Sequence, residues 1–428
     1  MTAPTTIPEP LAPAAPPTAP AAAPPGTPPA PGTPPAPDAP ASPDALVDPA
    51  LHADGDPFAV WRWMRAHAPV HRHEAGELPA FWSLTRHEDI RAVYRDPAVF
   101  SSARGVLLRS AALGDDPGGG TTLALTDPPR HKQLRGIVAD WFTARSVRSL
   151  EEPMRAATRA ILARAVEQGE CDLVHDVAGR LSIYVIGHIM GVPEEDHESL
   201  FAWTDEAFAA GLSLASSPRL MGYFIDLMNR RTADPTDDLT SMLVCGLIDD
   251  EPLTEYEIVL NCENLVGATE NGRLALAGGV QALLDRPDQL RQLREDRSLL
   301  PSAIEEVLRW TSSAAHSMRT ATRPVDIHGR HVEAGDRVVL WVPSANRDEA
   351  VFDDPDRFDI TRTPNRHLAF GGGEHFCIGS TLARAQMRIL YTELLDLAAR
   401  IDRTGPAHPV HSIAVRGPET LPVRITPR

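Results

Sequence analysis

The stretch from Phe370 to Gly379 reads F-G-G-G-E-H-F-C-I-G, and it decides how the rest of the chain is interpreted. Its three consecutive glycines allow a backbone with positive φ that can approach a flat partner closely. The thiol of Cys377 follows, just before a segment from Ile378 to Ala399 with apolar residues at helical spacing. The pattern therefore predicts a tight loop that leads into a helix, with Cys377 at the N-terminus of that helix.

A cysteine in this position has a distinctive chemistry. Free N–H groups and the positive end of the helix dipole favour the thiolate form there. In a glycine-walled loop that excludes water, a thiolate suits the axial position of haem iron, where it favours O–O cleavage. For the loop alone, two other interpretations stay open: a buried structural cysteine, and a phosphate-binding loop. The second is weakened because no Lys-Ser/Thr pair follows the glycines.

The complete string resembles the haem-binding loop of the cytochrome P450 family, in which Phe, two glycines, a basic residue, Cys and a final Gly recur at this spacing. The matching positions are Phe370, Gly371, Gly373, His375, Cys377 and Gly379. The resemblance implies that Cys377 ligates the iron of haem b (iron protoporphyrin IX). It also implies that Phe370 packs near the sulfur and that His375 reaches a haem propionate.

A second motif lies upstream, where Asp127-Pro128-Pro129 is a good helix start, with Asp as N-cap and Pro in the first turn. His131 and Arg135 follow four residues apart, so both can address one anion, although a solvated helix face is the alternative. D-P-P-x-H-x-x-x-R is another pattern of the same family, and it implies that both residues bind haem propionates. Arg319 stands where the family places a further propionate-binding arginine.

A long helix is predicted over residues 254–285, and residues 265–272 at its centre read L-V-G-A-T-E-N-G. Gly267 and Ala268 would let a planar group press against the backbone. A carboxylate such as that of Glu270 is costly in an apolar setting, which suggests a function for it. Close helix packing, with Glu270 at the surface, is the alternative.

The resemblance links this centre to oxygen activation, with one departure from the family pattern. The family has a small pair, any residue, an acid and then Thr, and acid and hydroxyl help to deliver protons. Glu270 supplies the acid, but Asn271 stands where Thr is expected, and an amide does not relay a proton as a hydroxyl does. Three outcomes stay open: Asn271 orders a water that delivers the proton, a substrate hydroxyl helps, or the reaction is a radical coupling without hydroxylation.

Other residues are predicted to support the Cys loop or to line a substrate cavity. Glu306 and Arg309 match the family's Glu-x-x-Arg, and Arg357 matches the third member of its buried charge network. The stretch 200–230 would form the roof over the substrate. Eight mostly apolar residues are predicted to line the cavity: Val106, Leu107, Leu108, Val266, Gly267, Ala314, Ala315 and His316. For the first three, a plain loop anchor is the alternative.

The fold predicted is mainly α. Residues 1–43 are dominated by Pro, Ala and Thr and are predicted to be a disordered tail. Residues 44–428 are predicted to form one large P450-type helical domain with small β-sheets. The haem would lie between the long central helix and the Cys loop. Residues 70–73 and 80–84 are predicted to pair as a hairpin.

Composition limits the partners. A net charge of −17 without runs of Lys or Arg argues against nucleic acid, and no apolar run is long enough for a bilayer. Four scattered cysteines indicate reduced thiols, so a cytoplasmic location is expected. The protein is also expected to be a monomer. The chain has no room for fused flavin or iron–sulfur domains, so ferredoxin and ferredoxin reductase are the expected electron donors. Four cations are predicted to form the docking patch: Arg130, Lys132, Arg384 and Arg388.

The resemblance implies a haem-thiolate monooxygenase that activates O2 and oxidises a mid-sized organic substrate in specialised metabolism. Hydroxylation is the expected reaction, and the substrate is free or carrier-bound. Asn271 leaves two alternatives open. One is oxidative phenol or aryl coupling, and the other is a haem-binding scaffold protein without catalysis.

Overall fold

The computed structural model describes residues 42–209 and 217–428. Nearly all of the predicted tail, residues 1–43, lies outside the described residues, as do residues 210–216 of the predicted substrate roof. No helix in the described ranges combines the length and the apolar character needed to span a bilayer.

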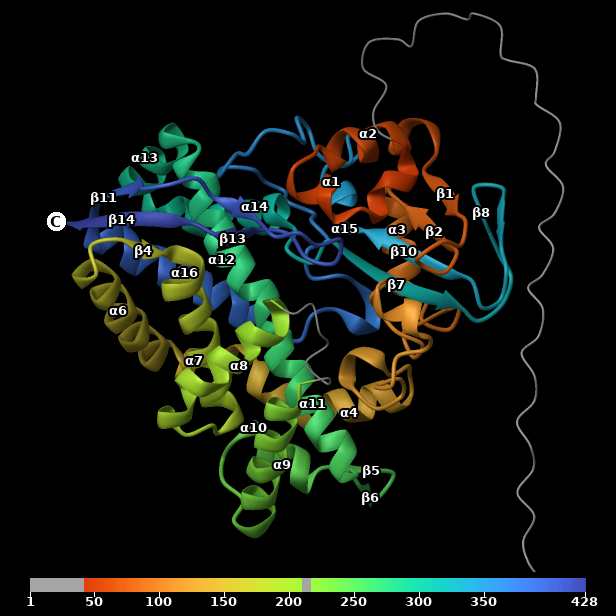
Figure 1. Cartoon of the computed structure of the whole chain (residues 1–428), viewed down its shortest axis with the longest axis horizontal. Helices are drawn as coiled ribbons and strands as arrows, with labels where there is room; N and C mark the ends of the chain where they lie inside the picture. The colour runs from red at the N-terminus through yellow and green to blue at the C-terminus, as the bar shows by residue number, and fades with distance from the viewer. Residues whose placement is uncertain (1–41, 210–216) are drawn as a thin grey trace, which may run out of the picture. The chain divides into compact units, whose positions relative to one another are not determined.

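Helices dominate, as the resemblance implies (Figure 1). Their bounds are α1 Pro49–Ala53, α2 Pro57–His67, α3 His87–Arg95, α4 Arg130–Val138, α5 Ala144–Ser149, α6 Glu151–Glu167, α7 Arg180–Met190, α8 His197–Ala209, α9 Pro218–Ala233, α10 Leu239–Cys245, α11 Glu255–Gly267, α12 Thr269–Leu284, α13 Pro287–Glu295, α14 Leu300–Thr311, α15 Val342–Ala345 and α16 Ser380–Leu397. Apolar side chains at three- and four-residue spacing on these helices form the main core. A fold of this kind buries one stripe of each helix against its neighbours.

The strands form small sheets. The largest sheet has five strands in the order β1-β2-β10-β7-β3, with bounds Val70–His73, Phe81–Leu84, Arg337–Trp341, His316–Ala321 and Phe100–Ser101. The others are β11-β14-β4 (Ala398–Arg403, Pro422–Pro427, Cys171–Asp172), β5-β6 (Leu247–Ile248, Glu251–Pro252), β8-β9 (Val325–Ile327, Arg330–Val332) and β12-β13 (His408–Pro409, Pro418–Thr420). The predicted hairpin is confirmed, since β1 pairs antiparallel with β2 in the register Val70 to Leu84.

The N-terminal helices cover one face of the five-stranded sheet. Leu46, Trp61 and Met64 pack in one cluster with Phe81 and Trp341 from β2 and β10. In Figure 1 these red helices lie beside the sheet, whereas α6, α7 and α16 lie on the opposite side of the drawing. The sheet thus forms one flank of the molecule and the helices form the other.

The predicted helix over residues 254–285 exists, but it is broken at Ala268 into α11 and α12. Thr254 and Glu257 form a capping box at the start of α11. At the break, the hydroxyl of Thr269 donates to the carbonyl of Val266 at 2.6 Å and competes with the backbone ladder there. The expectation of one uninterrupted helix is therefore wrong at this position.

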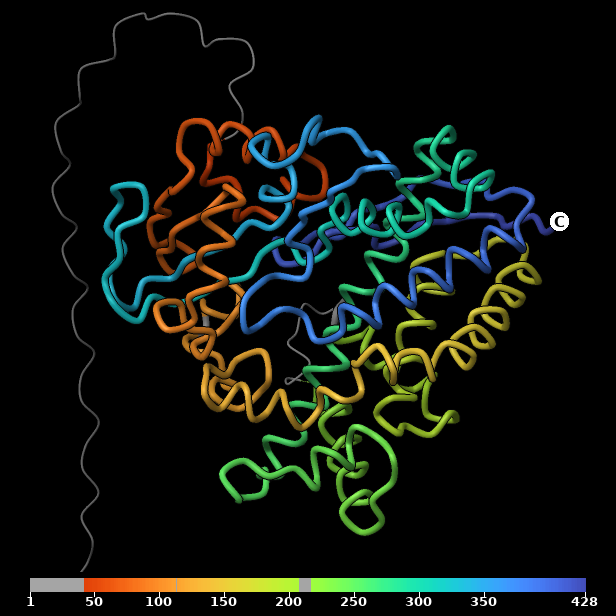
Figure 2. The backbone as a smooth tube through the Cα atoms, turned by 180° about the vertical axis from the view of Figure 1, so that it is seen from behind, coloured from red at the N-terminus to blue at the C-terminus, as the bar shows by residue number. Residues whose placement is uncertain are grey.

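The segment from Phe370 to Gly379, called the Cys loop below, leads into α16. The short helical turn Gly373–His375 within it contacts α3, and α14 packs against both α12 and α16. Figure 2 shows α16 in blue running beside the yellow α6, against which it packs. The Cys loop is therefore held at the start of a helix that belongs to the main core.

Candidate functional site

The Cys loop is a closed turn built by its own backbone. The N–H of Cys377 donates to the carbonyl of Phe370 at 3.0 Å, and the N–H of Ser380 donates to the carbonyl of Cys377 at 3.3 Å. Gly373 has a φ of +64°, and a Cβ there would lie 1.9 Å from the carbonyl oxygen of Tyr94. Only glycine fits that position, which explains how the loop can lie against the end of α3.

The electrostatics around the thiol differ from the expectation. The helix begins at Ser380 rather than at Ile378. Burial raises the pKa of Cys377, while the N–H of Gly379 and the guanidinium groups of Arg135 and Arg384 partly oppose that shift. The net direction is opposite to that predicted from the helix dipole, because desolvation outweighs the nearby donors. A coordinating metal ion removes a thiol proton outright, so the site still suits a metal-bound thiolate.

A histidine of the Cys loop faces a histidine of α4. The ring centroids of His131, on α4, and His375 lie 4.1 Å apart. Both ring nitrogens of His131 are buried without a hydrogen-bond partner in the described chain, and Nε2 of His375 has one contact, at 3.4 Å to Oγ of Ser102. Burial lowers the pKa of both rings, that of His375 to about 3 with help from the charge of Arg319. Two neutral rings thus present polar nitrogens to a group that the chain itself does not supply.

Two arginines lie close to His375, since the positive charges of Arg319 and Arg135 both lower the pKa of its ring. The buried guanidinium of Arg319 donates to the carbonyl of Met318 at 2.8 Å and has no ion-pair partner among the described residues. Arg135 donates to a carbonyl of the Cys loop at 2.9 Å. A buried cation without a counter-ion is costly. His131, Arg135, Arg319 and His375 therefore fit the two propionates of haem.

The acid of the central helix is buried, so its surface alternative is wrong. Glu270 pairs with Arg273 at 2.8 Å, and Arg273 also pairs with Asp205 of α8 at 2.6 Å. Burial raises the pKa of Glu270, and Arg273 partly opposes this. The neighbouring Asn271 has a buried Oδ1 without a partner in the described chain. Just after the break at Ala268, the chain thus carries two consecutive residues of this kind. One is an acid held in a chain of ion pairs, and the next has an amide oxygen without a partner in the described chain.

Sequence reasoning missed Glu263. This residue of α11 is 1% exposed, and neither carboxylate oxygen has a hydrogen-bond partner among the described residues. Burial raises its pKa to about 7. It lies one helical turn before Gly267 and on the same face. A signal existed in the sequence, since Glu263 is the one charged residue of the stretch 258–266, which is otherwise apolar apart from Asn261 and Asn264.

The charge network behind the Cys loop contains a different third member from the one predicted. Glu306 and Arg309 are both fully buried and form two bonds of 2.8 Å. Arg362 completes the network, with its Nε 3.2 Å from Glu306. Arg357 is 63% exposed at its side chain, and its closest carboxylate, that of Asp359, is 4.0 Å away. The prediction for the Arg357 side chain is wrong, although its carbonyl accepts from Arg309 at 3.0 Å.

One predicted cavity residue has another role. Nδ1 of His316 donates to the carbonyl of Ile413 at 2.8 Å, and Nε2 accepts from the N–H of Leu108 at 3.0 Å. Burial lowers the pKa of this ring to about 4, so it is neutral. Because both nitrogens serve the backbone, His316 has no ring nitrogen left for a substrate, and its prediction as a cavity-lining contact is wrong.

The other predicted cavity residues fall into separate groups. The carbonyl of Val106 accepts from Met318, Leu108 is packed under the N-terminal helices, and Leu107 is 40% exposed. These contacts favour the loop-anchor alternative for the three residues. Ala315 is buried and its N–H donates to the carbonyl of Ala414 at 2.9 Å, and Ala314 bridges to Val415. The remaining pair lies on α11: Val266, which is buried, and Gly267, at its end.

The four predicted docking cations each have an acidic partner within the chain. The pairs are Arg130 with Glu257, Lys132 with Glu374 at 3.1 Å, Arg384 with Glu305 at 2.6 Å and Arg388 with Glu151 at 2.6 Å. The positive field of this patch is therefore weaker than the sequence suggested.

Comparisons with known proteins agree with this geometry. The family model described as "Cytochrome P450" matches residues 280–397. Cytochrome P450 NovI of Streptomyces niveus is 35% identical and aligns over 88% of this chain and 95% of its own. The cyclomarin C epoxidase CymV of Salinispora arenicola is 37% identical over 87% and 97%. The crystal structure of P450 OxyD, involved in the biosynthesis of vancomycin-type antibiotics, matches with a TM-score of 0.81 at 35% identity over 90% and 99%.

Relatives of this identity, aligned over most of both chains, establish the family. The Cys loop is consistent with it, and so are the four residues that fit the haem propionates, called the propionate cluster below: His131, Arg135, Arg319 and His375. The chain belongs to the cytochrome P450 family of haem-thiolate monooxygenases, whose cofactor is haem b.

Proposed function

We propose that this monooxygenase hydroxylates a mid-sized organic substrate of specialised metabolism, free or carrier-bound. Electrons come from a separate ferredoxin and its reductase, and the active domain spans residues 44–428. Two relatives support the metabolic setting: one is a cyclomarin C epoxidase, and another is involved in the biosynthesis of vancomycin-type antibiotics.

The observation that carries hydroxylation is the buried acid at the helix break. Glu270 is connected through Arg273 to Asp205, at the less buried end of the charge chain. This arrangement holds a proton-exchanging group in a low-dielectric interior and still links it toward the surface. A water that donates a hydrogen bond to Oδ1 of Asn271, which has no partner in the described chain, would be a proton donor at the break.

Bound haem supplies the oxidising chemistry, and a thiolate ligand favours O–O cleavage. Cys377 provides that thiolate. The propionate cluster, His131, Arg135, Arg319 and His375, fixes the orientation of the cofactor. Phe370 would pack near the sulfur, and the guanidinium of Arg384 lies over its ring, 4.6 Å from the ring centroid. These residues hold the cofactor, whereas Glu270 and Asn271 manage the proton.

A second candidate reaction, phenol or aryl coupling, is favoured by one observation: Asn271 replaces the hydroxyl that the family pattern expects. Coupling joins two aromatic positions and leaves no oxygen from O2 in the product. The two reactions therefore differ in the fate of the oxygen atom.

Turnover with a surrogate ferredoxin and ferredoxin reductase tests the proposal. Compounds that displace water from the ferric haem are first selected by spectral titration and then incubated under isotopically labelled dioxygen. A product with one labelled oxygen atom supports hydroxylation, and a coupled product without label supports the second reaction. If every binding compound is left unchanged while electrons are supplied, the proposed catalysis is refuted. Cys377→Ser serves as the inactive control.

A further inference from the structure

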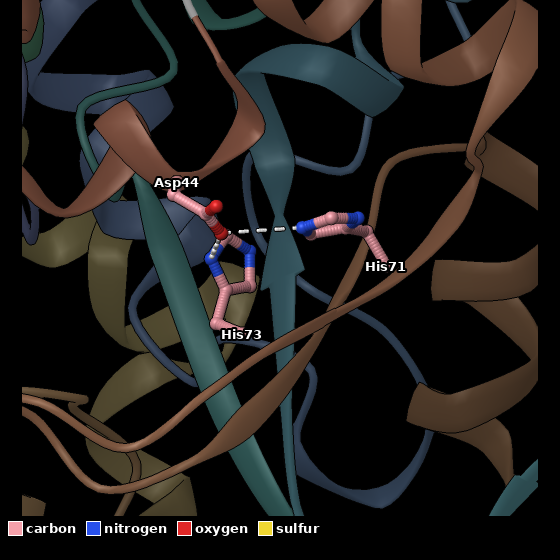
Figure 3. A group of neighbouring side chains, drawn as sticks. All are labelled: Asp44, His71 and His73. Carbon is pink, nitrogen blue, oxygen red and sulfur yellow. Dashed lines mark hydrogen bonds and ion pairs between the residues drawn. The ribbon is translucent and has the colours of Figure 1, made fainter. Parts of the chain in front are cut away.

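Three potential metal ligands meet on the sheet flank, away from the Cys loop. Figure 3 shows one carboxylate oxygen of Asp44 between the rings of His71 and His73. Oδ1 of Asp44 lies 3.3 Å from Nε2 of His71 and 3.1 Å from Nδ1 of His73. The three ligand atoms all lie within 4.8 Å of one another. Side chains two apart on a strand point to the same face, so β1 aims both rings at Asp44.

His73 is held in place from behind. It is buried, and its ring stacks on Phe81 with the centroids 4.2 Å apart and an interplanar angle of 8°. Nε2 of His73 lies 2.8 Å from Oγ of Ser83, which also accepts from the indole N–H of Trp341 at 2.8 Å. Outer partners of this kind fix the orientation of metal-ligating histidines and so strengthen binding.

The chain has one consistent hydrogen-bond assignment without a metal ion. Ser83 donates to Nε2 of His73, and the proton on Nδ1 is donated to Asp44. If that proton is replaced by a metal ion, Nε2–H donates to Ser83 instead and Nδ1 becomes a ligand.

We propose that Asp44, His71 and His73 bind one divalent transition-metal ion of the Zn²⁺ class, with water completing the coordination. Two imidazoles and a carboxylate are ligands that such ions accept. Ligand bonds of about 2.0–2.1 Å at tetrahedral angles separate ligand atoms by about 3.3–3.5 Å, close to both nitrogen–oxygen distances here. Asp44 is the exposed member, so water has access.

The site would join two parts of the fold. Asp44 belongs to the short helical turn Pro43–Val47, at the start of the described chain, whereas both histidines come from β1. Leu46 of the same turn is fully buried in the cluster that covers the sheet. A metal ion would therefore fasten the first turn of the domain to the sheet and protect that cluster.

Equilibrium dialysis tests the proposal on full-length, haem-loaded protein that has been treated with a chelator. The protein is dialysed against Zn²⁺, and bound zinc is then quantified. One saturable equivalent is expected, and Asp44→Ala and His71→Ala should weaken it at least about tenfold, since even outer partners are worth about 10–100-fold. Both residues are partly exposed, so these variants spare the core.

His331→Ala is the matched control, because His331 also lies beside two carboxylates, at 3.0 Å from Asp326 and 3.5 Å from Glu333. This variant should bind zinc like the wild type. Zinc at the exposed thiol of Cys245 would appear equally in all variants. Absence of saturable binding, or equal binding in the Asp44 and His71 variants and the wild type, overturns the proposal.

Thermal unfolding gives a second readout. A ligand that binds only the folded state raises the unfolding temperature, so zinc should stabilise the wild type and His331→Ala but not Asp44→Ala. If Asp44→Ala lowers the unfolding temperature and zinc leaves both proteins unchanged, the cluster is only an ion pair and the proposal fails.

Discussion

Two buried glutamates show how differently the two sides of the proposed haem site are built. Glu306, behind the Cys loop, accepts from Arg309, Arg362, Asn365 and a backbone N–H. Glu263, on α11, has no hydrogen-bond partner in the described chain. The carboxylate of Glu306 is neutralised by two arginines of the chain, so it needs neither a proton nor an external partner. The carboxylate of Glu263 must hold a proton or find a partner from outside the chain.

The buried polar groups therefore have different roles on the two sides of the site. Behind the Cys loop they fix one geometry, because both oxygens of Glu306 accept hydrogen bonds, although Oδ1 of Asn365 has no partner in the described chain. Along the central helix, Glu263 and Asn271 leave oxygen atoms free inside the protein. Buried acceptors without a partner are sites where a water or a substrate can bind. We therefore expect substrate preference to depend on the side of the site formed by the central helix.

The largest effect is expected from removal of the sulfur on the Cys-loop side. Cys377→Ser should abolish the thiolate-ligated absorption spectrum of the reduced carbon monoxide complex, because a hydroxyl is a poor iron ligand that keeps its proton. Cys245→Ser, at an exposed thiol, should leave the spectrum unchanged. An unchanged spectrum in Cys377→Ser would falsify the assignment of the iron ligand.

The next largest effect should come from Glu306. Glu306→Gln leaves Arg309 and Arg362 without their counter-charge and should lower the free energy of unfolding by about 3–5 kcal/mol, with loss of haem on purification. Denaturant unfolding measures the first change, and the ratio of haem to protein measures the second. Arg357→Ala should change stability by less than about 0.5 kcal/mol, because its side chain is exposed. Equal losses in both variants would restore Arg357 to the network.

The contrast between Arg357 and Arg362 also shows what the sequence could predict. The Cys loop was predictable because its function requires local features, namely glycines and a cysteine at fixed spacing. Helix types followed from apolar periodicity in the same way. Which arginine reaches Glu306 depends on how the loop that carries both is folded. Arg357 and Arg362 lie five residues apart in that loop, and the sequence does not show which of them pairs with Glu306.

Other differences arose from tertiary contacts as well. The break at Ala268 depends on the hydroxyl of Thr269 reaching a carbonyl, and no apolar pattern records that bond. His316 was expected in a cavity because of its place in the stretch before Arg319, but two backbone groups occupy its nitrogens. Glu263 was overlooked because an acid in the middle of α11, beyond the two glutamates of its first turn, was not treated as a signal.

A smaller effect is expected from Glu263→Gln, and it depends on pH. The folded-state pKa of Glu263 is raised from 4.5 to about 7. Its contribution to stability is therefore fully present below about pH 4.5 and is lost as pH rises through about 7, since only the unfolded state ionises in that window. At about 1.4 kcal/mol per pKa unit, the loss approaches about 3 kcal/mol in the wild type and is absent in the variant.

Denaturant unfolding of haem-loaded protein at about pH 5 and about pH 8 checks this sign. The advantage of Glu263→Gln over the wild type should grow between the two conditions. Glu333→Gln, at an exposed carboxylate, should show no such growth. A pH-independent difference would mean that the Glu263 carboxylate is ionised and has found a partner, and the contrast with Glu306 would disappear.

The smallest change in stability is expected from Asn271→Thr, although its effect on catalysis should be clear. Oδ1 of Asn271 has no partner among residues 42–209 and 217–428, so the free energy of unfolding should change by less than about 1 kcal/mol. Product formed per electron consumed should change, because a hydroxyl relays a proton directly whereas the amide only positions a water. Unchanged coupling would remove this side chain from oxygen activation. Thr269→Val is the matched control: its hydroxyl is already donated to Val266, so a loss of coupling there would trace to the helix break and not to proton delivery.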